Sequence, residues 1–145
     1  MTTKKIITYL LVAFVAFVFL QSLPFKFQLI ESEETAIIFS TIAAWMSSIG
    51  LGFIAPAFEA FGGYAVGVTE LIASILLIIP ATRRLGAVIG AFIISGAIFF
   101  HLFTPLGVNR VVDEAGNTDG GILFYMACGV FVSCVAIFFL SKKAD

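Results

Sequence analysis

Apolar residues gather along the chain into four segments, each long enough for a helix to cross the hydrocarbon core of a bilayer. Such a crossing takes about 20 mostly apolar residues, because each helical residue adds about 1.5 Å. Backbone groups find no water in hydrocarbon, so each segment must satisfy its own hydrogen bonds as a helix. The pattern predicts an all-α membrane protein, an antiparallel bundle of four transmembrane helices. The predicted spans are about 6–23, 64–80, 85–103 and 121–140.

A fifth apolar segment, at about 35–58, lies between the first two spans and contains no charged residue. It is long enough to cross the membrane as a further span. Its large apolar residues recur at helical spacing while its serines fall mostly elsewhere, which is typical of a helix lying in the membrane surface. We therefore favour an extra interfacial or re-entrant helix on the outer face. We expect Pro56 and Gly62-Gly63 to end it before the second span.

Charged residues indicate how the four spans are oriented. If the spans alternate, nearly all cations fall on one side, and an excess of Lys and Arg marks the cytoplasmic side. Both termini are therefore predicted to be cytoplasmic, whereas a fifth span would move Arg83 and Arg84 outward. The cations on the cytoplasmic side are Lys4, Lys5, Arg83, Arg84, Lys142 and Lys143; the other side carries Glu31, Glu33, Glu34, Glu59, Asp113, Glu114 and Asp119 with only Lys26 and Arg110.

The composition excludes a soluble protein and leaves no room for a separate domain. Of the 145 residues, 61% are hydrophobic, and the mean hydropathy is +1.13. We expect one domain over 1–145, a transmembrane four-helix bundle. A net charge of −1 gives no indication of a nucleic-acid partner. The apolar run after Lys4-Lys5 also resembles a signal peptide, but no small-residue cleavage site follows it, so we favour a retained helix.

Four polar residues fall at a similar depth in the outer half of the predicted bundle. Gln21, Glu70, His101 and Tyr125 each lie about 20–25 Å from the cytoplasmic cations when the distance is counted along a helix. An ionisable group in hydrocarbon costs several kcal/mol unless it is paired, neutral or hydrated. These residues therefore indicate a polar cavity, with groups suited to the carbonyl, hydroxyl or anionic head of a small ligand.

Glu70 and His101 each share a helix face with small residues, and such faces pack against other helices in membranes. The GxxxG spacings at Gly63–Gly67 and Gly86–Gly90 favour close packing of the second and third spans. We therefore expect the two side chains to lie close together and to form one polar site. For both residues a purely structural hydrogen bond between helices is the alternative.

Five further residues could be part of the site or could have a purely structural role. Lys26 is placed either to extend its ammonium to the surface or to hold an anion at the mouth of the cavity. Tyr125 suits either the cavity or the aromatic belt at the membrane interface. Asp119 is placed to cap the last span. Cys128 and Cys134, six residues apart on one predicted helix, point away from each other, so we expect packing residues without a disulfide.

Several stretches of the chain resemble the DoxX-like family of small four-helix membrane proteins. They are "PFKF" after the first span, "GVTELIASILLIIPATRRLGA" around Glu70, "SGAIFFHLFTPLG" around His101 and "DGGILFYMA" opening the last span. The likeness covers about 10–140. It implies an antiparallel four-helix bundle with a polar site near Glu70 and His101, and Lys26 as a weaker match. Relatives include subunits of a thiosulfate:quinone oxidoreductase, membrane partners of oxidative-stress enzymes and assembly factors.

Two functions follow from the resemblance and the polar residues. We favour a non-catalytic subunit or assembly factor of a larger complex in the bacterial inner membrane, because no paired-cysteine or haem-ligand motif is visible. The alternative is a quinone-linked redox subunit that binds a quinone or small sulfur compound at Glu70 and His101. A small-solute carrier fits less well, since no inverted repeat is visible. We assign no catalytic residue, metal or cofactor; the expected partners are the lipid bilayer, other membrane subunits and a quinone or small lipid-like ligand.

Overall fold

Six helices form the part of the chain that the computed structural model describes, residues 1–142. Lys143, which contributes to the charge pattern, lies outside the described residues. Four helical segments are long and apolar enough to cross a membrane, with mean hydropathies between 1.8 and 2.5. The prediction of an all-helical, polytopic membrane protein is confirmed at this level. The helices are α1 (Thr3–Gln21), α2 (Leu23–Lys26), α3 (Glu33–Ser48), α4 (Ala55–Ile78), α5 (Arg83–Phe103) and α6 (Ile122–Leu140), and α1 with α2 counts as one candidate span.

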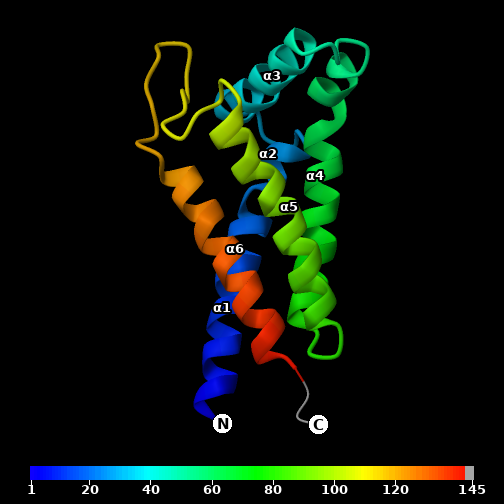
Figure 1. Ribbon diagram of the computed structural model, residues 1–145, viewed down its shortest axis with the longest axis vertical. Coiled ribbons are helices and arrows are strands. Elements are labelled where there is room, and N and C mark those ends of the chain that lie inside the picture. Colours follow the sequence, from blue (N-terminus) through cyan, green and yellow to red (C-terminus); the bar gives the residue numbers. More distant parts are fainter. Residues whose placement is uncertain (143–145) are drawn as a thin grey trace.

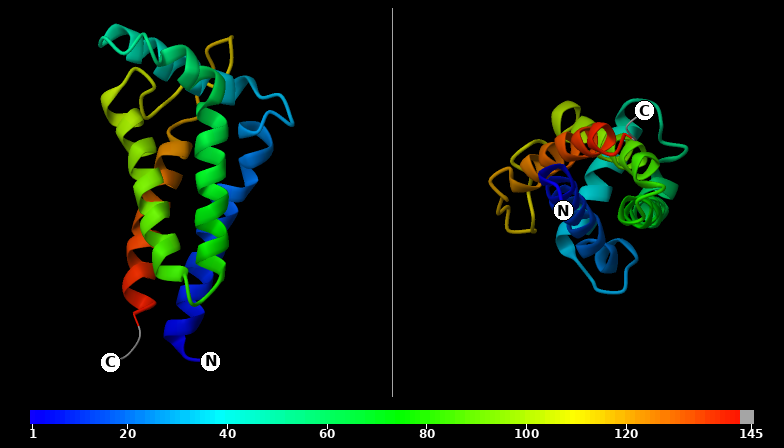
Figure 2. Two further views of the ribbon diagram at one scale, coloured as in Figure 1. Left: turned by 90° about the vertical axis from the view of Figure 1, so that its right-hand side faces the viewer. Right: turned by 90° about the horizontal axis from the view of Figure 1, so that it is seen from below.

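The four long helices stand side by side, with α3 lying across one end (Figure 1). The N-terminus, the end of α6 and the α4–α5 connection lie at the opposite end. Helix α1 packs against α4 and α6, and α5 packs against the same two helices, so the four form a ring (Figure 2). Their shared core consists of Val12, Val15, Val18, Phe19, Ala73, Leu77, Ala87, Ile94, Ala127, Val130, Cys134 and Ile137.

Helix α3 has a buried face of its own, which packs on the end of the bundle. Ile42, Ala43 and Met46 of this face form a second core with Ala55 and Leu106. The ring of Trp45 lies edge-on to two aromatic rings of α5, with centroids 6.1 and 6.2 Å away at Phe99 and Phe100. These contacts fix α3 as a cover over the helices below it.

The backbone turns sharply between α3 and α4. Helix α3 ends at Ser48, and Gly50 follows with a φ of 92°, a left-handed conformation that costs glycine little. The Leu51 amide then donates to the Met46 carbonyl at 2.8 Å, which satisfies one of the last carbonyls of the helix. The helix predicted at about 35–58 therefore ends earlier than expected, at Ser48.

The second spanning helix begins earlier than the sequence prediction placed it. Helix α4 starts at Ala55, so Pro56 lies in its first turn, where the missing amide would have had no helical partner. Gly62 and Gly63 lie inside α4 and are buried. The prediction that Pro56 and Gly62-Gly63 end the cover segment is wrong, because this proline starts a helix and these glycines allow close packing.

In the GxxxG pair Gly86–Gly90, only the first glycine lies at the contact between α4 and α5. A Cβ atom built at Gly86 would lie 2.6 Å from the backbone nitrogen of Leu77, so α4 and α5 meet closely near their connection, as expected. A Cβ at Gly90 would instead meet Cys134 of α6 at 3.0 Å. The second glycine of this pair therefore serves the contact with α6.

The other GxxxG pair packs against the segment that follows α1, not against α5. A Cβ at Gly63 would lie 2.9 Å from the carbonyl oxygen of Lys26, and one at Gly67 would lie 2.7 Å from the ring of Phe27. The expectation that this pair joins the second and third spans is wrong. Its small residues instead bring Lys26 close to α4.

Alanine substitutions at two glycines of α5 are expected to show how much stability depends on close packing and how much on helix propensity. Gly86→Ala should lower the free energy of unfolding by about 1–3 kcal/mol, because the new methyl would overlap the backbone of α4. Gly96→Ala is the control, since a Cβ at Gly96 meets no atom within 4 Å. Thermal unfolding in detergent would measure both; equal losses would contradict the packing described for Gly86.

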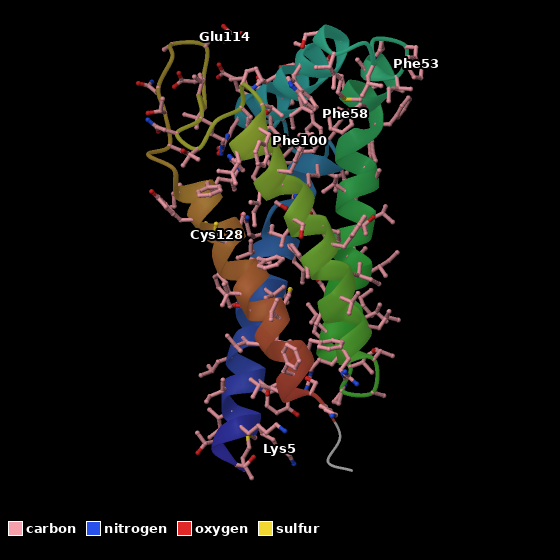
Figure 3. The ribbon with its side chains drawn as sticks, viewed as in Figure 1. Lys5, Phe53, Phe58, Phe100, Glu114 and Cys128 are labelled. Atoms are coloured by element: carbon pink, nitrogen blue, oxygen red, sulfur yellow. The ribbon has the colours of Figure 1, made fainter. Side chains whose placement is uncertain are left out.

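Charges separate between the two ends of the bundle. Figure 3 labels Lys5 near the end that carries the termini and Glu114 near the opposite end. Arg83 and Arg84 begin α5 at the terminal end. Arg83 is held there because its Nε donates to the carbonyl of Leu77 at 2.8 Å. The described residues thus keep the charge asymmetry that the alternating spans predict.

Candidate functional site

A cavity of about 850 Å³ lies among the helices beneath α3. All six helices contribute to its wall, and most of the lining side chains are apolar. Its volume falls within the range of small-molecule sites, which are mostly apolar with a few placed polar groups. The polar and charged residues that line it are Gln21, Ser22, Lys26, Glu31, Ser32, Glu34, Thr35, Thr69, Glu70, Ser95, His101 and Arg110.

An ion pair between Lys26 and Glu70 stands on one wall of the cavity. The Lys26 ammonium donates to both carboxylate oxygens of Glu70, at 2.7 Å to Oε1 and 2.6 Å to Oε2. The Glu70 side chain is 6% exposed and that of Lys26 19%. Two charges this deep are tolerated in a bundle because each neutralises the other.

The short helix α2 places Lys26 for this pair. Pro24 lies in its first turn, and the single turn ends with Lys26 facing α4. The Lys26 ammonium also donates to Ser22 Oγ at 3.0 Å, which fills a third donor position. The hydroxyl of Ser22 in turn donates to the Phe19 carbonyl at 2.9 Å. The ammonium is thereby fixed in one position instead of extending to the surface.

His101 lies in the last turn of α5, is buried, and lines the same cavity. Its Nδ1 lies 2.7 Å from the carbonyl oxygen of Gly107. A carbonyl oxygen only accepts, so Nδ1 carries the hydrogen and Nε2 is the acceptor in a neutral ring. The ring of Phe124 lies edge-on to the imidazole with centroids 5.7 Å apart. His101 thus ties α5 to the following loop and to α6.

Glu70 and His101 share the cavity but have different bonding partners. The carboxylate is bonded to Lys26, and the imidazole to a backbone carbonyl of the loop. The small-residue faces of the second and third spans predict that these two side chains come together as one site. The fold instead brings Lys26 to Glu70, because Gly63 and Gly67 let α2 and the residue after it approach α4 more closely than α5 does at this level.

Gln21 and Tyr125, which the sequence predicts at the same depth as Glu70 and His101, lie in different places from each other. Gln21 lines the cavity, and its side-chain amide donates to the Val18 carbonyl at 3.2 Å. Tyr125 does not line it, and 65% of this residue is exposed on the outer face of α6. Its ring packs edge-on to Phe124 with centroids 5.8 Å apart. Of the two interpretations of Tyr125, its position favours the interfacial belt over the cavity.

Arg110 is a buried cation that lines the cavity beside α3, and no motif in the sequence marks it as a site residue. Its side chain is 2% exposed; Nε lies 3.1 Å from Asp119 Oδ2, and Nη2 pairs with Glu34 of α3. Burial lowers the pKa of the Arg110 guanidinium, and Asp119 opposes that shift. In the described part of the chain its Nη1 has no hydrogen-bond partner. In the sequence, the only indication that Arg110 is paired is the excess of acidic residues around this single cation of the loop.

The Arg110 cluster joins three parts of the molecule. Asp119 accepts from the amides of Gly121 at 2.7 Å and Leu123 at 3.4 Å, so it caps α6 as the sequence predicted. The backbone amide of Glu114 donates to the carboxylate of Glu33 in α3. The α5–α6 loop is therefore bonded to α3 and to the start of α6 together.

The turn at Asp113 gives a pH-dependent prediction. The side-chain amide of Asn117 at 2.7 Å, and then its backbone amide at 3.0 Å, lower the pKa of Asp113. A carboxyl group whose folded-state pKa is lowered stabilises the turn above its unfolded pKa, and this contribution is lost as pH falls through the lowered pKa. We expect lower protection of the Asn117 amide below that pH in native-state hydrogen exchange, once the intrinsic exchange rate at each pH is taken into account. Asp113→Asn should remove the pH step; an unchanged step in that variant would contradict the assignment.

Cys128 and Cys134 are both free thiols, half-buried and buried respectively. Cys134 packs in the shared core of the bundle, as expected of a packing cysteine. Within residues 1–142, no three His, Cys, Asp or Glu side chains are grouped as metal ligands would be.

Comparison with known proteins adds no relative to this description. No protein-family model matches the chain, and no curated protein and no solved structure is detectably similar to it. The class of protein is therefore defined by the fold and the cavity alone. It is a polytopic helical membrane protein with a charged pair and an imidazole around one cavity.

Proposed function

We propose that this chain is a non-catalytic subunit or assembly factor of a larger membrane complex, and that it holds a small amphiphilic ligand in the cavity beneath α3. In this proposal it is a DoxX-like protein of the bacterial inner membrane with both termini in the cytoplasm. Helix α3 then lies as an interfacial cover on the outer face, where its apolar side rests on the bundle. The separation of Lys and Arg from the acidic end supports this orientation.

The observation that carries the proposal is the Lys26–Glu70 pair inside a mostly apolar cavity of ligand size. Each charge already has its partner, so the pair holds α2 on α4 and presents a polar wall without needing a reaction. The remaining cavity surface accommodates an apolar molecule with a small polar part. Such a site suits a component that retains a ligand or lipid for a complex.

Gentle purification tests the proposal. The protein would be extracted from its native membrane in mild detergent, and associated proteins and small molecules would be identified by native mass spectrometry. We expect a stoichiometric membrane partner and a bound amphiphile. Glu70→Gln should retain the partner, because the substitution keeps a hydrogen-bond acceptor toward Lys26. Recovery of the chain alone, with neither partner nor amphiphile, would contradict the proposal.

A quinone-linked redox subunit is the second candidate, and His101 is the observation in its favour. The Nδ1 bond to Gly107 leaves Nε2 as a proton acceptor in a residue that lines the cavity. In this function a partner protein supplies the electrons, and His101 accepts or returns a proton of the quinone. Quinone reduction by the intact complex that His101→Gln abolishes would favour this candidate. Loss of activity without loss of the partner would distinguish it from failed assembly.

A further inference from the structure

The cavity reaches the surface of the bundle between α4 and α5, where apolar side chains are exposed. Ala65 and Thr69 of α4 and Phe92 and Gly96 of α5 line it there. Phe92 is 83% exposed, and a Cβ at Gly96 meets no atom within 4 Å. The cavity is therefore open at this point, not closed by packed side chains.

The opening follows from how the two helices cross. They meet closely at Gly86, next to their connection. Figure 2 (left) shows that α4 and α5 separate from there toward the end covered by α3. The side chains between them are apolar or weakly polar, which suits a hydrocarbon chain and not a charged solute.

Another part of the lining is polar and reaches the surface away from α4 and α5. Gln21 of α1, Glu31 and Glu34 of α3 are exposed and line the cavity, as does Lys26. A molecule lying across the cavity would thus have apolar contacts at one end and polar contacts at the other. The site has the polarity of an amphiphile.

The charges of the lining indicate which head group fits. Three carboxylates, Glu31, Glu34 and Glu70, face two cations, Lys26 and Arg110. Both cations are already paired with carboxylates, so no free positive charge remains for an anionic head. Nη1 of Arg110 is buried without a partner among the described residues, so its N–H groups remain for a neutral acceptor such as a carbonyl or hydroxyl oxygen.

We propose that the cavity takes up an uncharged amphiphile with a long hydrocarbon tail laterally from the bilayer, through the opening between α4 and α5. The head accepts a hydrogen bond from Arg110, and the tail passes between Thr69 and Gly96 into the lipid. This inference rests on the proposed ligand-holding function and specifies its ligand class and route.

The only tryptophan of the chain provides the measurement. Trp45 packs on Phe100, which lines the cavity, so a quenching ligand in the cavity should lower its fluorescence. A benzoquinone with a ten-carbon tail would be titrated into the full-length protein in phosphatidylcholine nanodiscs. We expect saturable quenching, binding about tenfold or more weaker for the same quinone without its tail, and no displacement by decanoate at neutral pH.

Variants of the opening decide the route. Gly96→Leu, and independently Ala65→Leu on the facing wall, should weaken binding of the tailed quinone about tenfold or more. Val88→Leu is the matched control on α5, since Val88 is exposed and does not line the cavity. Arg110→Lys should weaken binding while retaining the charge, because an ammonium does not reproduce the guanidinium geometry.

Each contrary result has a definite meaning. Equal binding by Gly96→Leu, Ala65→Leu and Val88→Leu would overturn the lateral route. Displacement by decanoate would overturn the uncharged head, and non-saturable quenching that is equal in all variants would overturn the site. In all three cases an amphiphile that co-purifies with the native protein would still support the proposed function, so the two failures are distinguishable.

Discussion

Replacing Lys26 by methionine is expected to lower the free energy of unfolding by about 3–5 kcal/mol. The substitution keeps the length and apolar stem of the side chain but leaves the carboxylate of Glu70, 6% exposed, without its counter-ion. A charge left unpaired in a site of low polarity loses its hydration without compensation. The measurement is unfolding in detergent, by heat and by titration with a denaturing detergent.

A double variant of Lys26 and Glu70 distinguishes the effect of the ion pair on stability from the effect of the packing around it. When Lys26 and Glu70 are both replaced by methionine, no buried charge remains, and we expect a stability within about 1–2 kcal/mol of the native protein. Cys134→Ala is a control in the core of the same bundle, and its loss should be smaller than that of Lys26→Met because it leaves no unpaired charge. Losses that simply add in the double variant would show that the two residues act separately.

The spanning helices were predictable from the sequence because the bilayer leaves few alternatives. A long apolar segment in hydrocarbon must be a helix, and Arg83 and Arg84 at the end of one such segment separate the second span from the third. Between the predicted segment at about 35–58 and the second span the sequence has one charge, Glu59, and it lies inside α4 and not at the start of that helix. Pro56 and the two glycines were the other boundary signals. Pro56 suits a helix start as well as a helix end, and packing decides between them.

The members of the site were easier to predict than their pairing. Burial of Glu70 follows from its place in an apolar segment, but its partner is 44 residues away, in a single-turn helix that only the tertiary fold positions. The glycine pair at Gly63 and Gly67 indicated a close approach without naming the neighbour. Arg110 lay in a loop, where no periodicity exists to indicate burial.

Arg110→Ala is expected to release α3 from the bundle as well as to lower stability by about 3 kcal/mol. The guanidinium holds two carboxylates from different elements, Glu34 of α3 and Asp119 at the start of α6. Asp119 is 7% exposed, so its charge would be left buried, whereas Glu34 is 51% exposed and would be solvated at little cost. The loss should therefore come mostly from Asp119 and the cap of α6.

Hydrogen–deuterium exchange would localise this effect. In Arg110→Ala we expect faster exchange in α3, in the α5–α6 loop and in the first turn of α6, with the α4–α5 connection unchanged. Glu34→Ala should affect α3 alone and with a smaller change, because the Asp119 pair remains. Lys5→Ala, in the exposed first turn of α1, is the control for loss of a cation. Uniformly faster exchange in all helices would contradict a local latch and would indicate a general loss of stability.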